Sequence, residues 1–142
     1  MSMRASAVPD QELLRKALLI EPDNADVHHS LGLLLVRQHA YNDALAELRK
    51  ASELAPDNVR YAYVYAVALN STGAPDQAMA LLESTHRRHP NDPDVLLALV
   101  SIARDNGDAA TALRYARDLA ALHPTDPQVR AMVTDLEKRQ TR

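Results

Sequence analysis

Apolar and polar residues recur along this chain with the period of an α-helix. Within residues 10–21, apolar side chains follow the i, i+1, i+4, i+5 spacing that marks one face of a helix. These residues are Leu13, Leu14, Ala17 and Leu18. The last stretch, 127–139, repeats the pattern with charged residues on its other side, and its inward positions are Val129, Met132, Val133 and Leu136. Residues 1–9 precede the pattern and are expected to form a flexible lead.

A second regularity divides the chain into units of 34 residues. It is marked by four prolines at Pro22, Pro56, Pro90 and Pro124. Two places after each proline stands an Asn or Asp, namely Asn24, Asn58, Asp92 and Asp126. A proline ends the preceding helix, and a short oxygen-bearing side chain caps the next one. A fixed period of this size predicts a helical solenoid. We expect a single domain over 10–142, with the half repeat 10–22, the repeats 25–58, 59–92 and 93–126, and the capping helix 127–139.

Residues inside the repeats carry a family resemblance. The positions concerned in the first full repeat are Leu31, Gly32, Ala44, Leu48 and Pro56. They resemble the Leu-Gly pair, the Ala-x3-large-apolar step and the closing Pro of the tetratricopeptide repeat (TPR). The resemblance covers about residues 10–139, and it implies an all-α, right-handed helix-turn-helix solenoid. The third repeat departs from the pattern, with Val100 at the Gly place and Ala116 where a larger apolar residue is usual.

The turn between the two helices of each repeat has its own signal. Gly73 and Gly107 are 34 residues apart at this turn, where a residue that can adopt a positive φ is useful. His39 fills the same place in the first repeat. We therefore expect His39 to replace a glycine there.

Composition narrows the possible partners and compartments. The chain has 142 residues, 46% of them hydrophobic and 25% charged, with a formal net charge of −3 and no cysteine. This charge gives no cationic field that would attract nucleic acid, so a nucleic-acid partner is not expected. The apolar runs are too short to span a membrane, so a membrane is not expected as a partner either. The first residues lack the apolar core of a signal peptide. We expect a soluble chain in the cytoplasm or, if it is a piece of an exported parent, in the periplasm.

The first helix of each repeat has two sides, separated at 100° per residue. One side should pack on the second helix; in TPR proteins the other lines a concave groove. The residues predicted to line that groove are His29, Leu33, Val36, Arg37, Arg60, Tyr63, Val67, Asn70, Leu97, Ser101 and Arg104. Helix geometry places Tyr63 in the groove and Tyr61 and Tyr65 between helices. The plainer alternative for Tyr63 is packing against a neighbouring Leu.

Sites with catalytic or metal chemistry are not expected. His86 and His89 have the i, i+3 spacing of two metal ligands, but no carboxylate or Cys nearby completes the set, and the last turn of a helix also favours cations. There is no nucleophile motif, no HExxH and no phosphate-cradling Gly loop, so neither an enzyme nor a cofactor is predicted. The chaperone-tail clamp found in some TPR proteins is also excluded, because its Lys and Asn places hold His29 and Leu33.

The leading prediction is a non-catalytic scaffold that binds a helix or an extended peptide in the groove. The runs EPDNADVHHSLGLLLVRQ and YAYVYAVALNSTG also resemble the C-terminal TPR tails of bacterial multihaem c-type cytochrome proteins. That resemblance implies the alternative of a structural spacer in a larger exported redox protein, although this chain has no CxxCH. A metal-binding or catalytic domain is the third hypothesis. We expect mostly a monomer, with weak self-association through the half repeat, whose Leu13, Leu14 and Leu18 lack a first helix.

Overall fold

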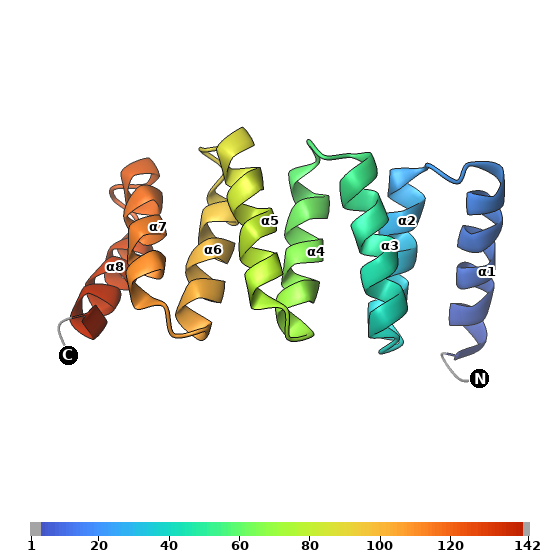
Figure 1. Cartoon of the computed structure of the whole chain (residues 1–142), viewed down its shortest axis with the longest axis horizontal. Helices are drawn as coiled ribbons and strands as arrows, with labels where there is room; N and C mark the ends of the chain where they lie inside the picture. The colour runs from blue at the N-terminus through green and yellow to red at the C-terminus, as the bar shows by residue number, and fades with distance from the viewer. Residues whose placement is uncertain (1–3, 141–142) are drawn as a thin grey trace. The chain divides into compact units, whose positions relative to one another are not determined.

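The computed structural model describes residues 4–140, and the side chains from residue 10 onwards. This part of the chain folds into helices joined by short turns and contains no strand (Figure 1). The helices are α1 (Arg4–Ile20), α2 (Ala25–Arg37), α3 (Tyr41–Leu54), α4 (Val59–Ser71), α5 (Pro75–Arg88), α6 (Pro93–Asp105), α7 (Ala109–Leu122) and α8 (Pro127–Gln140). The predicted all-α, helix-turn-helix architecture is confirmed.

The start of α1 differs from the sequence prediction. The helix begins at Arg4, whereas the apolar pattern placed its start at residue 10 and assigned 1–9 to a flexible lead. Once a helix has nucleated, each further residue adds a hydrogen bond at little cost, so extension needs no apolar period of its own. Residues 4–9 therefore belong to the helix, and residues 1–3 lie outside the described part.

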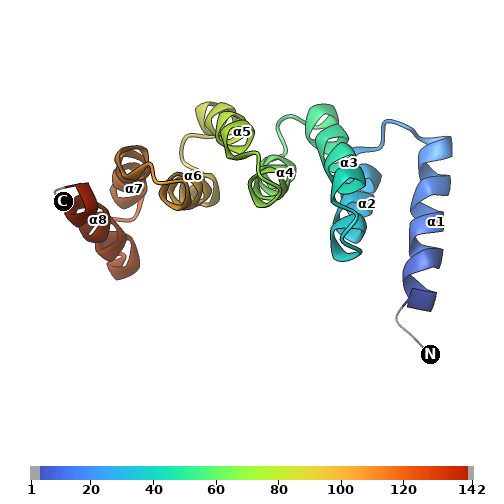
Figure 2. The same ribbon diagram turned by 60° about the horizontal axis from the view of Figure 1, so that its bottom comes forward.

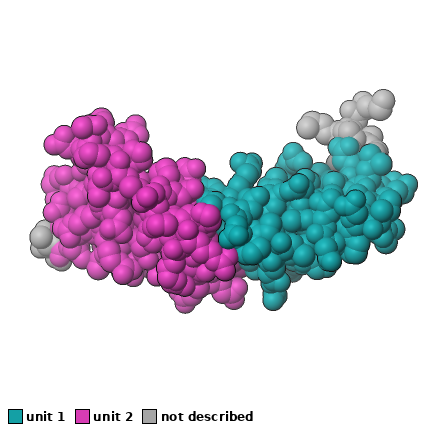
Figure 3. Space-filling view, turned by 90° about the horizontal axis from the view of Figure 1, so that it is seen from above, with its two compact units in different colours: residues 1–68 teal, residues 69–142 magenta. Residues whose placement is uncertain are grey.

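Contacts divide the chain into two compact units (Figure 3). Their boundary lies inside α4. Unit 1 ends at Ala68 and unit 2 begins at Leu69. In unit 1, α2 packs on α3 and on α1. In unit 2, α6 packs on α5 and α7, and α7 packs on α8 (Figure 2). Whether the two units behave as the single domain predicted from the sequence stays a prediction.

Each unit has a core built from facing small and large residues. In unit 1, Leu31, Leu35 and Ala44 form a buried cluster, against which α1 packs Leu14 and Leu18. A Cβ added at Gly32 would lie 2.6 Å from Cδ2 of Leu48, so α2 and α3 approach closely here. In unit 2, the larger residue of this pair stands on the first helix and the smaller one on the second helix. Val100 stands at the Gly place and Ala116 at the Leu place, and both are fully buried.

The predicted helix caps are confirmed by hydrogen bonds. The side-chain oxygens of Asn24 and Asn58 each accept from the backbone N–H three residues later, at 3.1 Å. Asp92 accepts from two N–H groups of the next turn, and so does Asp126. Each cap satisfies donors that a helix start leaves without a partner.

The turns inside the repeats follow the predicted backbone. Gly73 has φ 92° and Gly107 has φ 81°. His39 has φ 61°, and within the described residues it is the one non-glycine residue with a positive φ. The prediction that His39 occupies a glycine place is confirmed.

Candidate interaction surface

The first helices of unit 1, α2 and α4, carry most of the predicted groove residues. Arg37, Arg60, Tyr63 and Val67 are exposed, while Leu33 and Val36 are half-buried. We call these six residues the α2–α4 face. It combines apolar side chains with two arginines. Neither Arg37 nor Arg60 forms an ion pair among the described residues.

The three tyrosines of α4 separate as helix geometry predicts. Tyr63 is 36% exposed, whereas Tyr61 is 7% exposed and Tyr65 is half-buried. The Tyr61 hydroxyl donates a hydrogen bond to the Asp26 carboxylate on α2, which fixes its ring between the helices. Burial raises the pKa of the half-buried Tyr65. Because Tyr61 and Tyr65 are enclosed by the helices, Tyr63 is the one tyrosine of α4 that is accessible to a partner.

His29 departs from the prediction that it lines an open surface. Its side chain is 6% exposed, and its ring stacks on Tyr61 with centroids 4.3 Å apart. Neither ring nitrogen has a hydrogen-bond partner in the described part of the chain. Burial, and secondly the Arg60 charge, lower the pKa of His29, while Asp26 acts in the opposite direction. Helix phase gave the direction of this side chain correctly but could not show that Tyr61 covers it.

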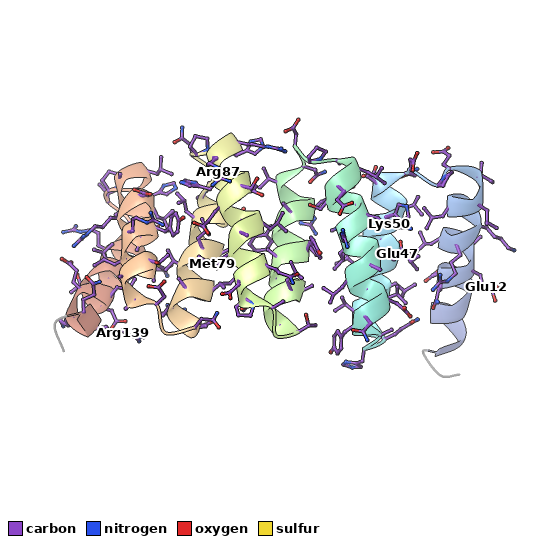
Figure 4. All side chains as sticks on the ribbon, viewed as in Figure 1. Glu12, Glu47, Lys50, Met79, Arg87 and Arg139 are labelled. Atoms are coloured by element: carbon purple, nitrogen blue, oxygen red, sulfur yellow. The ribbon has the colours of Figure 1, made fainter. Side chains whose placement is uncertain are left out.

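His28 makes contacts that the sequence did not reveal. Its Nδ1 lies 2.6 Å from a Glu47 carboxylate oxygen, and its Nε2 lies 2.7 Å from the Pro22 carbonyl oxygen. Glu47 belongs to α3 (Figure 4), so this ring connects α2 both to α3 and to the turn after α1. The sequence suggested only a residue that fills space between helices. The pairing depends on how α2 and α3 align, which no local spacing reports.

Unit 2 carries the other predicted groove residues. Leu97 is exposed, and Asn70, Ser101 and Arg104 are half-buried. Arg104 lies 3.9 Å from Asp105, and the Asn70 side chain accepts a hydrogen bond from Asn106 at 3.4 Å. Leu97 opens onto a pocket of about 210 Å³ between α6, α7 and α8. Its apolar walls also include Leu119, Val129 and Met132.

The histidine pair in unit 2 lies at the end of α5. The His86 ring packs edge-on against Tyr115, with centroids 5.7 Å apart, and His89 follows the last helical residue. Within the described residues, no group of three or more His, Asp or Glu side chains is placed to hold a metal ion. Nor does any helix in that part of the chain have the length and apolar character needed to cross a membrane.

Comparison with known proteins gives the family. A family model described as the cytochrome c-type biogenesis protein H TPR domain matches residues 11–130. The chain belongs to this TPR family. The TPR resemblance inferred from Leu31-Gly32 and the 34-residue period is thereby confirmed. The further resemblance to multihaem cytochrome proteins stays untested. No curated protein matches the chain in sequence.

Solved structures show the same TPR solenoid fold. MamA from Desulfovibrio magneticus RS-1 is similar over 97% of this chain and 78% of its own, with a TM-score of 0.77 and 16% identity. A tetratricopeptide repeat protein from Parabacteroides merdae ATCC 43184 has a TM-score of 0.84 and 18% identity, over 97% of this chain and 55% of its own. At such identities the likeness concerns the fold alone.

Proposed function

We propose that this TPR domain binds a polypeptide on the exposed side of its first helices. The observation that carries the proposal is the contrast between Tyr63 and Tyr61, which are two residues apart on α4. Tyr61 is held inside by Asp26 and His29, whereas Tyr63 leaves its ring exposed beside Val67. An exposed Tyr next to apolar residues is a frequent anchor of protein interfaces, since its large contact area costs little rotamer entropy.

The charges of the α2–α4 face favour an acidic partner segment. Arg37 and Arg60 have no ion pair among the described residues, whereas Arg104 in unit 2 lies beside Asp105. Asp26, an acidic residue in the first turn of α2, already accepts a hydrogen bond from the Tyr61 hydroxyl. A carboxylate of a partner would therefore find an available guanidinium group at Arg60, three residues before Tyr63 on α4, and a second one at Arg37, the last residue of α2. Such charges mainly raise the association rate and discriminate between partners.

The family suggests which process the partner belongs to. Because its description refers to cytochrome c-type biogenesis, we propose that the partner is a polypeptide of that process. The first candidate is a c-type cytochrome chain before haem attachment. This chain would act by holding the polypeptide and would perform no chemistry on it.

The test compares two double variants of the full chain. Tyr63→Ala with Leu97→Ala removes exposed apolar side chains from first helices. Tyr41→Ala with Leu54→Ala removes similarly exposed ones from a second helix, α3, and serves as the control. The probe is a haem-free apocytochrome c, and binding is measured by calorimetry.

We expect the first pair to lower affinity at least tenfold, since a true anchor contributes about 2 kcal/mol or more. Melting should change little for either pair, because these side chains are exposed. Equal affinity of the Tyr63/Leu97 variant and the parent would overturn the proposed surface. If the parent itself does not bind the apocytochrome, the proposed partner is wrong, and the spacer alternative gains support.

A further inference from the structure

The pocket of unit 2 has the size of a single side chain. Its volume is about 210 Å³, and its walls come from α6, α7 and α8. Leu97, Leu119, Val129 and Met132 supply apolar surface, and Asp94 supplies a carboxylate. Pockets for whole small molecules usually begin at roughly 300 Å³, so this one suits one residue of a polypeptide better than a cofactor.

The repeat shows what fills the same place in unit 1. Asp26, His29 and Tyr61 stand two repeats before Asp94, Leu97 and Val129. In unit 1, the Tyr61 hydroxyl donates a hydrogen bond to Asp26, and the Tyr61 ring stacks on His29. An aromatic ring of the chain itself therefore closes this place between α2 and α4.

In unit 2, the groups that would contact such a ring are open. Val129 has neither an aromatic ring nor a hydroxyl. Leu97 is 43% exposed, whereas His29 at the same place of unit 1 is 6% exposed. The Asp94 side chain is exposed and has no hydrogen bond or ion pair among the described residues.

The open space results from residue types and not from a missing helix. The helices α6, α7 and α8 correspond to α2, α3 and α4, so both sets of three are present. Leu119 and Met132 are larger than Ala51 and Val64 at the same places, and the pocket of about 210 Å³ remains beside them.

We propose that this pocket receives a tyrosine side chain of the polypeptide that the domain binds. The ring would lie against Leu97 and Val129, and its hydroxyl would donate a hydrogen bond to Asp94. This inference rests on the proposed function, because it names a side chain that the bound polypeptide contributes. A covered Tyr needs a partner for its hydroxyl, and a carboxylate is a stronger acceptor than a neutral group.

The wall of the pocket argues against a cationic side chain as the occupant. Asp126, the other carboxylate of the wall, already accepts hydrogen bonds from the backbone N–H groups of Gln128 and Val129. A Lys or Arg would therefore meet one available carboxylate and an otherwise largely apolar surface. Covering a charge with apolar groups costs more than covering a phenol ring.

The experiment uses N-acetyl-tyrosinamide as the probe. N-acetyl-phenylalaninamide, which lacks the hydroxyl, is the matched control. Each is titrated into the full chain, and the methyl resonances of Leu97, Leu119 and Val129 are followed by NMR. The same titrations are made with Asp94→Ala and with Tyr63→Ala, which changes an exposed side chain of unit 1. Circular dichroism checks that each variant keeps its helices.

We expect the tyrosine probe to bind the parent about threefold or more tightly than the phenylalanine probe, because only its hydroxyl reaches a charged acceptor. Asp94→Ala should remove this difference, and Tyr63→Ala should leave it unchanged. The double variant Val129→Tyr with Leu119→Ala copies Tyr61 and Ala51 of unit 1. Its own ring should fill the pocket and abolish most of the binding of both probes.

Three results would overturn the proposal. They are the absence of shifts at the pocket methyl groups, an equal effect of Asp94→Ala on the two probes, and tighter binding of N-acetyl-argininamide. A calorimetric titration with haem-free apocytochrome c separates this test from that of the proposed function. If the tyrosine probe binds as expected and the apocytochrome does not bind, the pocket is supported and the proposed partner is wrong.

Discussion

Two adjacent histidines of α2 show how strongly surroundings differ over one residue. His28 has an oxygen acceptor at each ring nitrogen, from Glu47 and Pro22. His29 has none within the described residues and instead stacks on Tyr61. Burying a polar group without a hydrogen bond is costly, and burying it charged costs more. His29 is therefore a place where the fold resists protonation.

We predict that His29 makes the fold less stable in mild acid. Its pKa in the folded chain lies below the ordinary value of 6.5, with burial as the main cause and Arg60 as the second. As the pH falls below 6.5, the unfolded chain binds a proton at His29 before the folded chain does, so unfolding becomes more favourable. The variant His29→Phe keeps a ring for stacking on Tyr61 and removes this proton uptake.

The measurement is urea unfolding of the parent and His29→Phe between pH 8 and pH 5. The difference in unfolding free energy should be constant above pH 7.5 and should shift in favour of the variant as the pH falls below 6.5. A difference that does not depend on pH would show that His29 is protonated equally easily in both states.

The tyrosines and His29 also show what helix phase can predict at the residue scale. Phase placed Tyr63 outward and Tyr61 inward, and the structure agrees. It placed His29 on the same outward stripe, yet Tyr61 from the next repeat covers that ring. Phase gives the direction of a side chain, whereas burial depends on the residues that a neighbouring helix brings. Whether the exposed residues bind a partner is a further question that the pattern does not answer.

At the scale of helix pairs, α2–α3 and α6–α7 solve one packing problem in two ways. The first pair faces Gly32 with Leu48, and the second has Val100 and Ala116 at these places. Interiors are close-packed, so a large residue on one helix requires a small one opposite. The third repeat therefore departs from the TPR pattern by placing the larger residue on its first helix and the smaller residue on its second helix.

This exchange predicts a compensating double variant. Gly32→Val alone should destabilise the chain by about 1–3 kcal/mol, because the added side chain overlaps Leu48. Leu48→Ala alone should cost about 2–5 kcal/mol, since it leaves a cavity. The double variant copies the Val100/Ala116 pair, so it should be clearly more stable than the sum of the two losses implies. Thermal and urea unfolding of the four proteins would measure this coupling, and strictly additive losses would contradict it.

The sequence predicted the helix boundaries well where side chains mark them. A proline such as Pro56 ends one helix, and an Asn or Asp such as Asn58 caps the next. These helix ends therefore follow from local chemistry. The start of α1 has no cap or apolar period of this kind, and the prediction missed its first residues. Contacts between helices, such as that of His28 with Glu47, depend on how two helices align and have no local signal.

For the whole molecule, the boundary between the two units runs through a continuous helix. Tyr61 and Ala66 of α4 are buried before the boundary, and Leu69 is buried after it. Neither unit has its full set of buried residues unless α4 is formed. Because helix formation is cooperative and each repeat depends on its neighbours, we predict that the two units unfold together.

Two reporter variants can test this cooperativity, because the chain contains no tryptophan. Tyr41→Trp places a reporter on α3 in unit 1, and Ala121→Trp places one on α7 in unit 2, both at exposed positions. Urea unfolding followed by tryptophan fluorescence should give the same midpoint for both variants, equal to that seen by circular dichroism. A lower midpoint for one reporter would show that its unit unfolds first and that α4 can be half formed. In that case the chain would consist of two domains rather than one.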